Sequence, residues 1–328
     1  MMISGATGLV GSHLITSLLD SQGGAAKYSP IAVGHSEQSW ERLEWLLARR
    51  GLDPKGLCER RVAELEYIDD CRRLIQEHRP EVLFHCAARV SVGAARDGER
   101  LVTENVAMTH NLITAALELP VDERPLFVHV SSIAALGGSV GPNGCIDEGA
   151  VMENLAGASA YARSKFLAEN EVWRGAAHGL RVVMVNPGVI LGEMSPESGY
   201  WLNGLFAAVR RGGGRFWIEG KTSFVSADDV ARAMLLLSER PESWGKRYIL
   251  SAENLSYRRF LSLIARAVDR PEPMFRIPRW MVRAASRFAP ALAALTASGR
   301  RYDGSAILNA IPFRYSDLSR VLDQVGSL

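Results

Sequence analysis

The stretch that decides the fold of this chain is Gly5-Ala6-Thr7-Gly8-Leu9-Val10-Gly11, close to the N-terminus. It follows a short apolar run, Met2–Ser4, and opens an apolar helical pattern. Three glycines at this spacing between a strand and a helix are typical of a loop that wraps around the phosphates of a dinucleotide. Gly5 permits a tight turn, Gly8 lets the backbone approach the pyrophosphate, and Gly11 allows the helix to pack closely on the strand. The free N–H groups and the dipole at the helix N-terminus favour the same anion, so we predict a dinucleotide-binding loop.

Short apolar runs alternate with helical patterns through the rest of the first two thirds of the chain. Strands are predicted at Met2–Ser4, Pro30–Val33, Arg61–Leu65, Val82–Cys86, Leu126–Ser131 and Arg181–Asn186. Helices are predicted between them at Gly11–Asp20, Trp40–Arg50, Asp69–Glu77, Leu101–Leu117 and Ala158–Ala177. This alternation indicates βαβ units, and strands that are apolar on successive residues indicate helices on both faces of the sheet. The predicted fold is therefore α/β, a Rossmann-type doubly wound parallel sheet.

The order of elements becomes less regular toward the C-terminus. Phe224–Val225 and Asp228–Leu237 predict a strand and a helix that return to the main sheet, and Tyr248–Leu250 predicts a further strand. From about Asn254 onward the pattern is mostly helical, with prolines between the helices. We predict a dinucleotide-binding domain of residues 1–184 and 221–252. Residues 185–220 and 253–328 then form a smaller, mostly helical substrate-binding subdomain.

Composition narrows the function classes. The net charge of +2 over 328 residues predicts no strong field for nucleic acid, and no apolar run reaches the length of about 18 residues that suggests a membrane span. No signal peptide precedes the glycine motif. Only four residues precede Gly5, so either the first strand is unusually short or the N-terminus is truncated. The four cysteines and seven histidines show no metal-binding spacing. We expect free thiols, no metal site and a cytoplasmic location.

A serine, a tyrosine and a lysine form the candidate proton-handling site. The strand Leu126–Ser131 runs into Ser132, and Tyr161 and Lys165 lie one helical turn apart on one face of a predicted helix. A tyrosine hydroxyl titrates near 10, and a neighbouring ammonium favours its phenolate. Tyr161 can then exchange a proton with a substrate oxygen, which Ser132 stabilises by a hydrogen bond.

With the glycine loop, Ser132 and the Tyr161/Lys165 pair in this order, the sequence resembles the extended short-chain dehydrogenase/reductase superfamily, also called the NAD-dependent epimerase/dehydratase family. Within it, the sequence is most similar to dihydroflavonol-reductase-like and 3β-hydroxysteroid-dehydrogenase-like members. The resemblance implies that Ser132 rather than Ser131 is the catalytic serine, that Asn105 braces the active site, and that Asn186 stands where the family more often has Arg. The expected cofactor-binding residues are Gly5, Thr7, Gly8, Leu9, Val10, Gly11, His35, Ser36, Arg42, Glu64, Leu65, Cys86, Ala87, Ala88, Tyr161, Lys165, Pro187, Gly188 and Val189.

The end of the second predicted strand bears on the choice of cofactor. NAD-preferring sites usually carry an acid there to hold the ribose hydroxyls. Here the nearest acid is Glu37, whereas His35, Ser36 and Arg42 suit a 2′-phosphate. NADP is therefore the favoured cofactor, and NAD is the alternative.

Three reactions compete for the same residues. A dehydratase is disfavoured because Ile133 and Ala134 offer no acid after Ser132. A non-catalytic cofactor-binding regulator is disfavoured because the serine, tyrosine and lysine are all present. A sugar-nucleotide epimerase keeps the same three residues and stays open beside the favoured reductase or alcohol dehydrogenase.

The C-terminal part indicates the substrate class. The amphipathic stretch Pro278–Phe288, continued by Leu292, Ala293 and Leu295, resembles a segment that covers the substrate in steroid-dehydrogenase-like members. An apolar cover suits a hydrophobic small-molecule ketone better than a sugar nucleotide. Residues 270–328 also hold nine Arg and no Lys against four acids, which could attract an anionic substrate or a membrane surface. Membrane-surface contact is not the expected mode. The resemblance implies that two helices could form a homodimer face.

Overall fold

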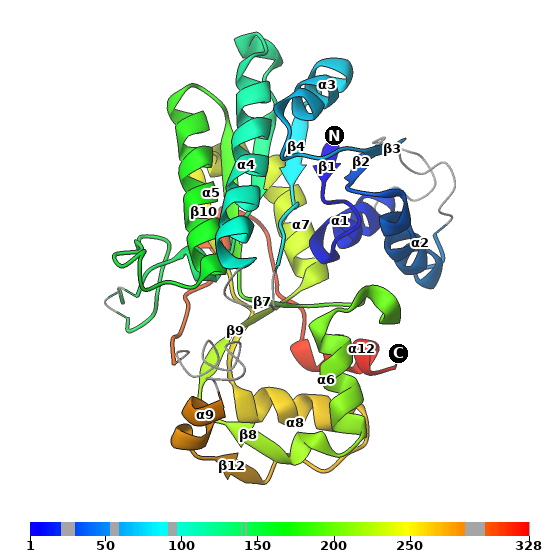
Figure 1. Cartoon of the computed structure of the whole chain (residues 1–328), viewed down its shortest axis with the longest axis vertical. Coiled ribbons are helices and arrows are strands. Elements are labelled where there is room, and N and C mark those ends of the chain that lie inside the picture. Colours follow the sequence, from blue (N-terminus) through cyan, green and yellow to red (C-terminus); the bar gives the residue numbers. More distant parts are fainter. Residues whose placement is uncertain are drawn as a thin grey trace.

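The central element of the computed structural model is a seven-stranded parallel sheet (Figure 1). The structure describes residues 1–20, 30–52, 59–90, 97–138, 140–141, 143–285 and 299–327. Its strands are β1 (Met2–Ser4), β2 (Ile31–Gly34), β3 (Glu59–Val62), β4 (Val82–His85), β5 (Leu126–Val130), β6 (Val182–Pro187) and β10 (Lys246–Leu250). Their order is β10-β6-β5-β4-β1-β2-β3, so the direction of winding reverses between β1 and β4. In open α/β sheets a ligand binds at such a reversal, outside the carboxyl ends of the strands.

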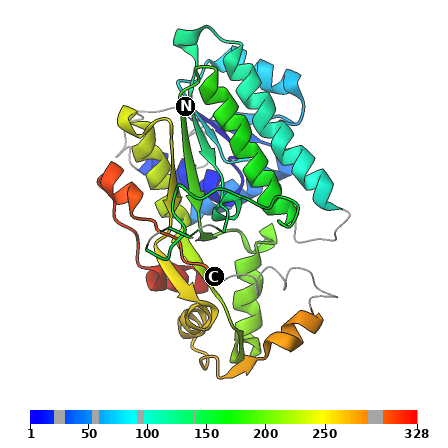
Figure 2. The ribbon, with the colours of Figure 1, turned by 90° about the vertical axis from the view of Figure 1, so that its left-hand side faces the viewer.

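Helices cover both faces of this sheet, as Figure 2 shows. One face carries α1 (Leu9–Asp20), α2 (Trp40–Arg49) and α7 (Ala227–Ser238), and the other carries α3 (Ile68–His78), α4 (Gly98–Leu117) and α5 (Ala160–Ala177). Ile3 and Ala32 pack in the first apolar layer, whereas their neighbours Met2 and Val33 pack in the second. Strands that are apolar on both sides are those expected between two helix layers. The predicted fold class is confirmed.

A second body of structure lies beyond the carboxyl ends of the main strands. It contains a three-stranded sheet of β7 (Val189–Leu191), β9 (Lys221–Ser226) and β11 (Glu253–Ser256), and a two-stranded sheet of β8 (Phe216–Ile218) and β12 (Phe275–Ile277). Its helices are α6 (Trp201–Arg210), α8 (Tyr257–Ala267), α9 (Arg279–Ala285) and α12 (Leu318–Gly326), whereas α11 (Ala306–Ala310) packs beside β10 of the main sheet. Helices α6, α8 and α12 share one apolar cluster with β7 and β9. The division into two domains at the predicted boundaries stays a prediction.

One strand does not take the predicted place. The prediction that Phe224–Val225 returns to the main sheet is wrong, because β9 pairs with β7 and β11 instead. The place beside β6 is taken by β10, whose Lys246–Leu250 pair with Val183–Pro187. The helix after β9 does return: the Ser226 side chain accepts a hydrogen bond from Asp229 N at 2.9 Å, and α7 then packs beside α1.

Other differences are smaller. Strand β3 ends at Val62, so the predicted strand Arg61–Leu65 lies earlier than expected. The strands β7, β8, β11 and β12 were not predicted, because runs of three or four residues are too short to show a period. Cys58 and the amphipathic stretch from residue 286 through Leu295 lie outside the described residues. None of the described helices combines the length and apolar character needed to cross a membrane.

Candidate active site

The glycine loop between β1 and α1 is closed by backbone contacts that leave no room for side chains. Gly5 has φ 68°, in the left-handed region, and a Cβ added there would lie 2.6 Å from Ala87 Cα. A Cβ on Gly11 would lie only 2.2 Å from the carbonyl oxygen of Gly5. Gly8 N donates to Gly5 O at 3.0 Å, which completes the turn before α1 begins at Leu9. The loop thus presents bare backbone and a helix N-terminus, the surface that a pyrophosphate requires.

Replacing Gly11 by Ala is therefore expected to displace the loop. The added methyl overlaps Gly5 O, and forcing such an overlap costs about 1–3 kcal/mol. We expect the affinity for a nicotinamide dinucleotide, measured by fluorescence titration, to fall roughly 10- to 100-fold. Gly204→Ala is the matched control, because nothing lies within 4 Å of that Cβ on α6. Equal affinities for the two variants would contradict this function of the loop.

The other predicted cofactor residues follow neighbouring strands at the same edge of the sheet. After β2, a Cβ on Gly34 would lie 3.4 Å from the Thr7 methyl, so His35 and Ser36 come next to the glycine loop. After β4, Cys86 N donates to Ser4 O at 3.0 Å, and Ala87 packs against Gly5. These segments surround the start of α1, as a bound dinucleotide needs.

Two further segments with predicted cofactor contacts follow strands β3 and β6, which lie farther from β1 in the sheet. After β3, Leu65 is buried and its carbonyl accepts from Asn111 Nδ2 at 3.0 Å, while Glu64 is exposed. At the end of β6, Gly188 N donates to Leu250 O at 3.0 Å, so Pro187–Val189 pass between the main and the three-stranded sheets. The roles of all these residues as cofactor ligands stay predictions.

Ser132, Tyr161 and Lys165 come together at the carboxyl end of β5. A side-chain hydrogen bond joins Ser132 and Tyr161. Lys165 is buried, and its Nζ donates to Val130 O at 2.9 Å. Tyr161 enters at the start of α5, where the side chain of Ser159 caps the helix by accepting from Ala162 N.

The electrostatics of this group are set mainly by burial. Burial raises the pKa of Tyr161, and the hydrogen bond with Ser132 opposes that rise. Burial also lowers the pKa of Lys165 to about 8, while its electrostatic interactions with Cys86 and Glu169 oppose that fall. Lys165 is still mostly an ammonium at neutral pH, which is the form that favours phenolate on a neighbouring tyrosine.

The two serines at the end of β5 have different partners. Ser131 Oγ donates to Glu169 Oε1 at 2.5 Å, so its hydroxyl is engaged within the protein. Ser132 Oγ accepts from Ala134 N at 3.1 Å and also bonds with Tyr161. This arrangement favours Ser132 as the group that meets a substrate oxygen.

Asn105 acts at a distance from these groups. From α4, its Nδ2 donates to Ser164 Oγ at 3.1 Å and to Arg89 O at 3.0 Å, and its Oδ1 accepts from Arg89 N at 2.7 Å. It thus ties the segment after β4 to helix α5. This position suits the bracing role that the resemblance implies, which stays a prediction, and no contact with Tyr161 is among those described.

Sequence reasoning missed two charged residues of this region, Glu169 and Arg247. Glu169 lies one helical turn after Lys165, and that spacing could have indicated a third residue on the same face. Arg247 precedes the predicted strand Tyr248–Leu250 and gave no sequence signal. Their side chains are 3.1 Å apart between Arg247 Nη1 and Glu169 Oε2.

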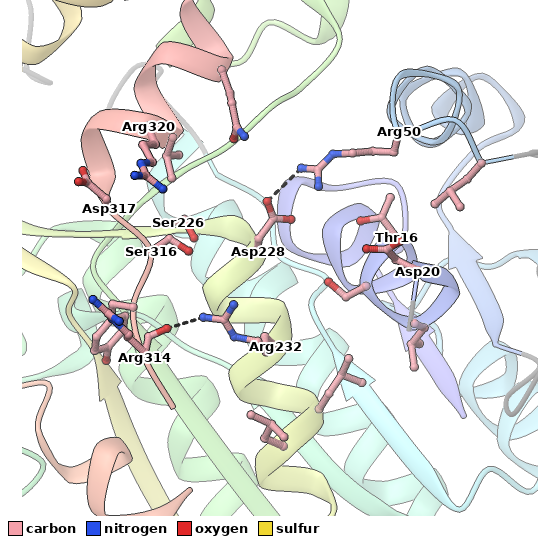
Figure 3. Close-up of a pocket in the computed structure, with 18 of the residues that line it drawn as sticks. Thr16, Asp20, Arg50, Ser226, Asp228, Arg232, Arg314, Ser316, Asp317 and Arg320 are labelled. Carbon is pink, nitrogen blue, oxygen red and sulfur yellow. Dashed lines mark hydrogen bonds and ion pairs between the residues drawn. The ribbon is translucent and has the colours of Figure 1, made fainter. Parts of the chain in front are cut away.

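A cavity of about 1030 Å³ lies away from the candidate site (Figure 3). On its walls, Arg50 Nη2 donates to Asp228 Oδ2 at 3.0 Å, and Arg232 Nη2 donates to Arg314 O at 2.5 Å. Its α1 wall begins only at Thr16, whereas a dinucleotide binds at the N-terminus of the first helix. None of the predicted site residues lines it, so we assign it no part in the reaction.

Comparison with known proteins finds relatives among reductases and related enzymes. A sterol demethylase protein B of Methylococcus capsulatus is 28% identical over 279 residues, which cover 84% of this chain and 77% of that protein. A provisionally named dihydroflavonol 4-reductase of Synechocystis is 30% identical over 204 residues, which cover 61% of this chain and 57% of that protein. The crystal structure of yeast methylglyoxal/isovaleraldehyde reductase complexed with NADPH superposes with a TM-score of 0.77 at 18% identity, covering 99% of this chain and 96% of that one.

The family model for the NAD-dependent epimerase/dehydratase family matches residues 1–250. That range includes the glycine loop, Ser132, Tyr161 and Lys165, which carried the resemblance in the sequence. The predicted family and the predicted kind of enzyme are confirmed. The chain belongs to the NAD-dependent epimerase/dehydratase family, as an NAD(P)-dependent enzyme of the extended short-chain dehydrogenase/reductase type.

Proposed function

We propose that this chain transfers hydride between NADP(H) and a ketone, an aldehyde or a secondary alcohol on a fairly hydrophobic small molecule. The observation that carries the proposal is the hydrogen-bonded pair of Ser132 and Tyr161 beside the buried ammonium of Lys165. This group stands at the carboxyl edge of the sheet, on the same side as the glycine loop. It combines a proton donor, an oxygen-binding hydroxyl and a fixed positive charge.

Each residue has a distinct part in the reductive direction. Tyr161 gives its hydroxyl proton to the substrate oxygen, and Ser132 donates a hydrogen bond to that oxygen as charge develops on it. Lys165, held by Val130 O, stabilises the phenolate that Tyr161 becomes. Asn105 keeps α5 in register with the segment after β4. The bound cofactor supplies the hydride.

The proposal of NADP over NAD rests on the residues after β2. The strand ends at Gly34, and the first acid, Glu37, is exposed and begins a separate 3₁₀ turn, Glu37–Ser39. Arg42 is half-buried on α2, just beyond that turn. A guanidinium there suits a 2′-phosphate, because bidentate hydrogen bonds to phosphate are strong.

The proposal of a hydrophobic substrate rests on the second body of structure and on the relatives. We assign residues 185–220 and 253–328 to substrate binding, since β7 continues directly from the carboxyl end of β6 and shares a separate three-stranded sheet with β11. Trp280 and Met281 on α9 are exposed apolar side chains in this part. The names of the Methylococcus protein and the yeast enzyme point to a sterol and to small aldehydes.

The test is a comparison of two reactions and two cofactors. We expect the purified chain to oxidise NADPH in the presence of isovaleraldehyde, a dihydroflavonol or a 3-ketosteroid, and to leave UDP-glucose unchanged.

In fluorescence titration, Arg42→Ala should weaken NADPH binding about tenfold and leave NADH binding within about twofold. Arg73→Ala is the control, since Arg73 is exposed on α3 and pairs with Asp70. Interconversion of UDP-glucose and UDP-galactose with bound NAD would establish the epimerase instead, and NADH binding tighter than NADPH would overturn the cofactor assignment.

A further inference from the structure

A buried carboxylate lies behind Ser132 and Lys165. The Glu169 residue is 2% exposed. Its Oε1 accepts from Ser131 Oγ at 2.5 Å and from Asn186 Nδ2 at 2.6 Å. Its Oε2 lies 3.1 Å from Arg247 Nη1. Because a buried charge costs several kcal/mol unless it is paired and hydrogen-bonded, these four side chains form one interdependent group.

This group reaches the candidate catalytic residues from two directions. The Asn186 amide nitrogen that donates to Glu169 also donates to Ser132 O at 3.0 Å. Glu169 itself follows Lys165 by one turn of α5, on the same face as Tyr161. The carboxylate therefore ties the strand end that carries Ser132 to the helix that carries Tyr161 and Lys165.

Arg247 is held in place independently of Glu169. From β10, at the edge of the sheet, its Nε donates to Glu148 O at 2.7 Å and its Nη2 donates to Ala150 O at 2.5 Å. Its remaining nitrogen, Nη1, is directed at the carboxylate. The guanidinium side chain is 16% exposed, so the ion pair is shielded from most of the solvent. A charge fixed in this way holds its partner in one position.

We propose that Glu169 and Arg247 are a positioning pair for the proton transfer: Arg247 holds the Glu169 carboxylate in place, and that carboxylate positions Ser132 through Asn186 and supports the Lys165 ammonium one helical turn away. The proposal rests on the proposed function of the Ser132, Tyr161 and Lys165 group. Neither member of the pair touches a substrate in this scheme. Both act through the residues that do.

The surroundings of Lys165 agree with this role. The titratable groups that face it are Cys86 and His85 at the end of β4, His129 on β5 and Glu169 on α5. Burial lowers the pKa of both histidines, so they are neutral near pH 7, and burial raises the pKa of the Cys86 thiol to about 12. Among these groups, Glu169 is the acid whose charge supports the Lys165 ammonium.

The first experiment needs neither substrate nor cofactor. The chain has five lysines, so the titration of Lys165 can be followed by NMR with ¹³C-labelled lysine and assigned with Lys165→Arg. In the double variant Glu169→Gln/Arg247→Met, we expect the midpoint of the Lys165 titration to fall by about one pH unit from its position near 8. The matched control is Lys246→Met, next to Arg247 on β10 but exposed. An unchanged midpoint in the double variant overturns the proposal, whether or not the chain reduces any carbonyl.

The second experiment uses turnover of the carbonyl compound found in the reductase assay. The double variant should lose about 10- to 100-fold in kcat, with KM changed less than about threefold. The alkaline limb of its pH–kcat profile should move to lower pH by the same amount as the titration midpoint of Lys165. A change in KM alone, or an unmoved alkaline limb, counts against the pair. If no carbonyl is reduced, the proposed function fails while the NMR result still decides the pairing.

Glu169→Asp tests the positioning role of Glu169 if the double variant does not fold. It keeps the charge opposite Arg247 and withdraws the carboxylate by one methylene from Ser131 and Asn186. We expect kcat to fall about tenfold while the Lys165 midpoint stays within a few tenths of a pH unit. A kcat equal to that of the unaltered chain would overturn the positioning role.

Discussion

Replacing Tyr161 by Phe is expected to lower turnover about a thousandfold and to leave cofactor binding within about twofold. The variant keeps the ring of a half-buried residue and removes only the hydroxyl that bonds with Ser132. General acid–base catalysis by one side chain contributes about 10²- to 10⁴-fold, so loss of the proton donor should remove most of the rate. Initial rates of NADPH oxidation and a fluorescence titration of NADPH measure the two quantities separately.

Tyr248→Phe is the matched control for this experiment. Tyr248 is a buried tyrosine of β10 whose hydroxyl makes a long contact, 3.4 Å, with Ser243 O. That variant should keep turnover within about threefold. Near-normal rates in Tyr161→Phe on a true substrate would show that another group delivers the proton.

The second large effect is expected on stability in acid, through two histidines within the sheet. Burial, with the charge of Lys165 as a smaller cause, lowers the pKa of His85 to about 3. Burial, followed by the charges of His85 and Lys165, lowers the pKa of His129 well below its ordinary value. The rings lie 5.2 Å apart between centroids on the neighbouring strands β4 and β5.

The sign of the effect follows from proton uptake. An unfolded chain protonates these histidines below about pH 6.5, whereas the folded chain does not until far lower pH. Their contribution to stability is therefore complete above about pH 6.5 and is lost as the pH falls toward about 3. The loss approaches about 1.4 kcal/mol per pH unit for each histidine, or roughly 4 kcal/mol for both at about pH 5. Urea unfolding at a series of pH values measures it.

His129→Phe isolates one of the two rings. Among the described residues, neither ring nitrogen of His129 has a hydrogen-bond partner, whereas His85 lies 2.7 Å from Ser4 Oγ and 3.0 Å from Thr109 Oγ1. The variant should gain about 1–3 kcal/mol near pH 7.5, where both states are neutral, because it buries no unpaired nitrogen. Between about pH 6 and 4 its free energy of unfolding should fall less steeply, by about 1.4 kcal/mol per pH unit. Equal slopes in the two chains would contradict the buried neutral state of His129.

Local pattern was sufficient for much of the fold. The structure agrees to within three residues with the predicted helices Trp40–Arg50 and Leu101–Leu117 and with the strand Met2–Ser4. The reason is that the spacing of apolar residues along the chain follows the helical and the strand period. The order of elements and the glycine spacing then specified a doubly wound sheet with its dinucleotide loop after β1. The kind of enzyme was predicted from a family resemblance carried by Ser132, Tyr161 and Lys165.

Local pattern did not predict which strands pair when they are far apart in the sequence. Phe224–Val225 reads as a strand from its residues alone, but its sheet depends on β10 already lying beside β6. Nothing local distinguishes Ser131 from Ser132 either, until Glu169 engages the first of them.

The sequence by itself thus determined the helices and strands, the glycine loop and the order of the serine, tyrosine and lysine. Only the tertiary structure decided which edges pair and which charges meet in the interior, as Arg247 and Glu169 do from positions 78 residues apart. The physical reason is that periodicity acts over a few residues, whereas the cost of burying a charge is offset by whichever partner the folded chain brings within reach.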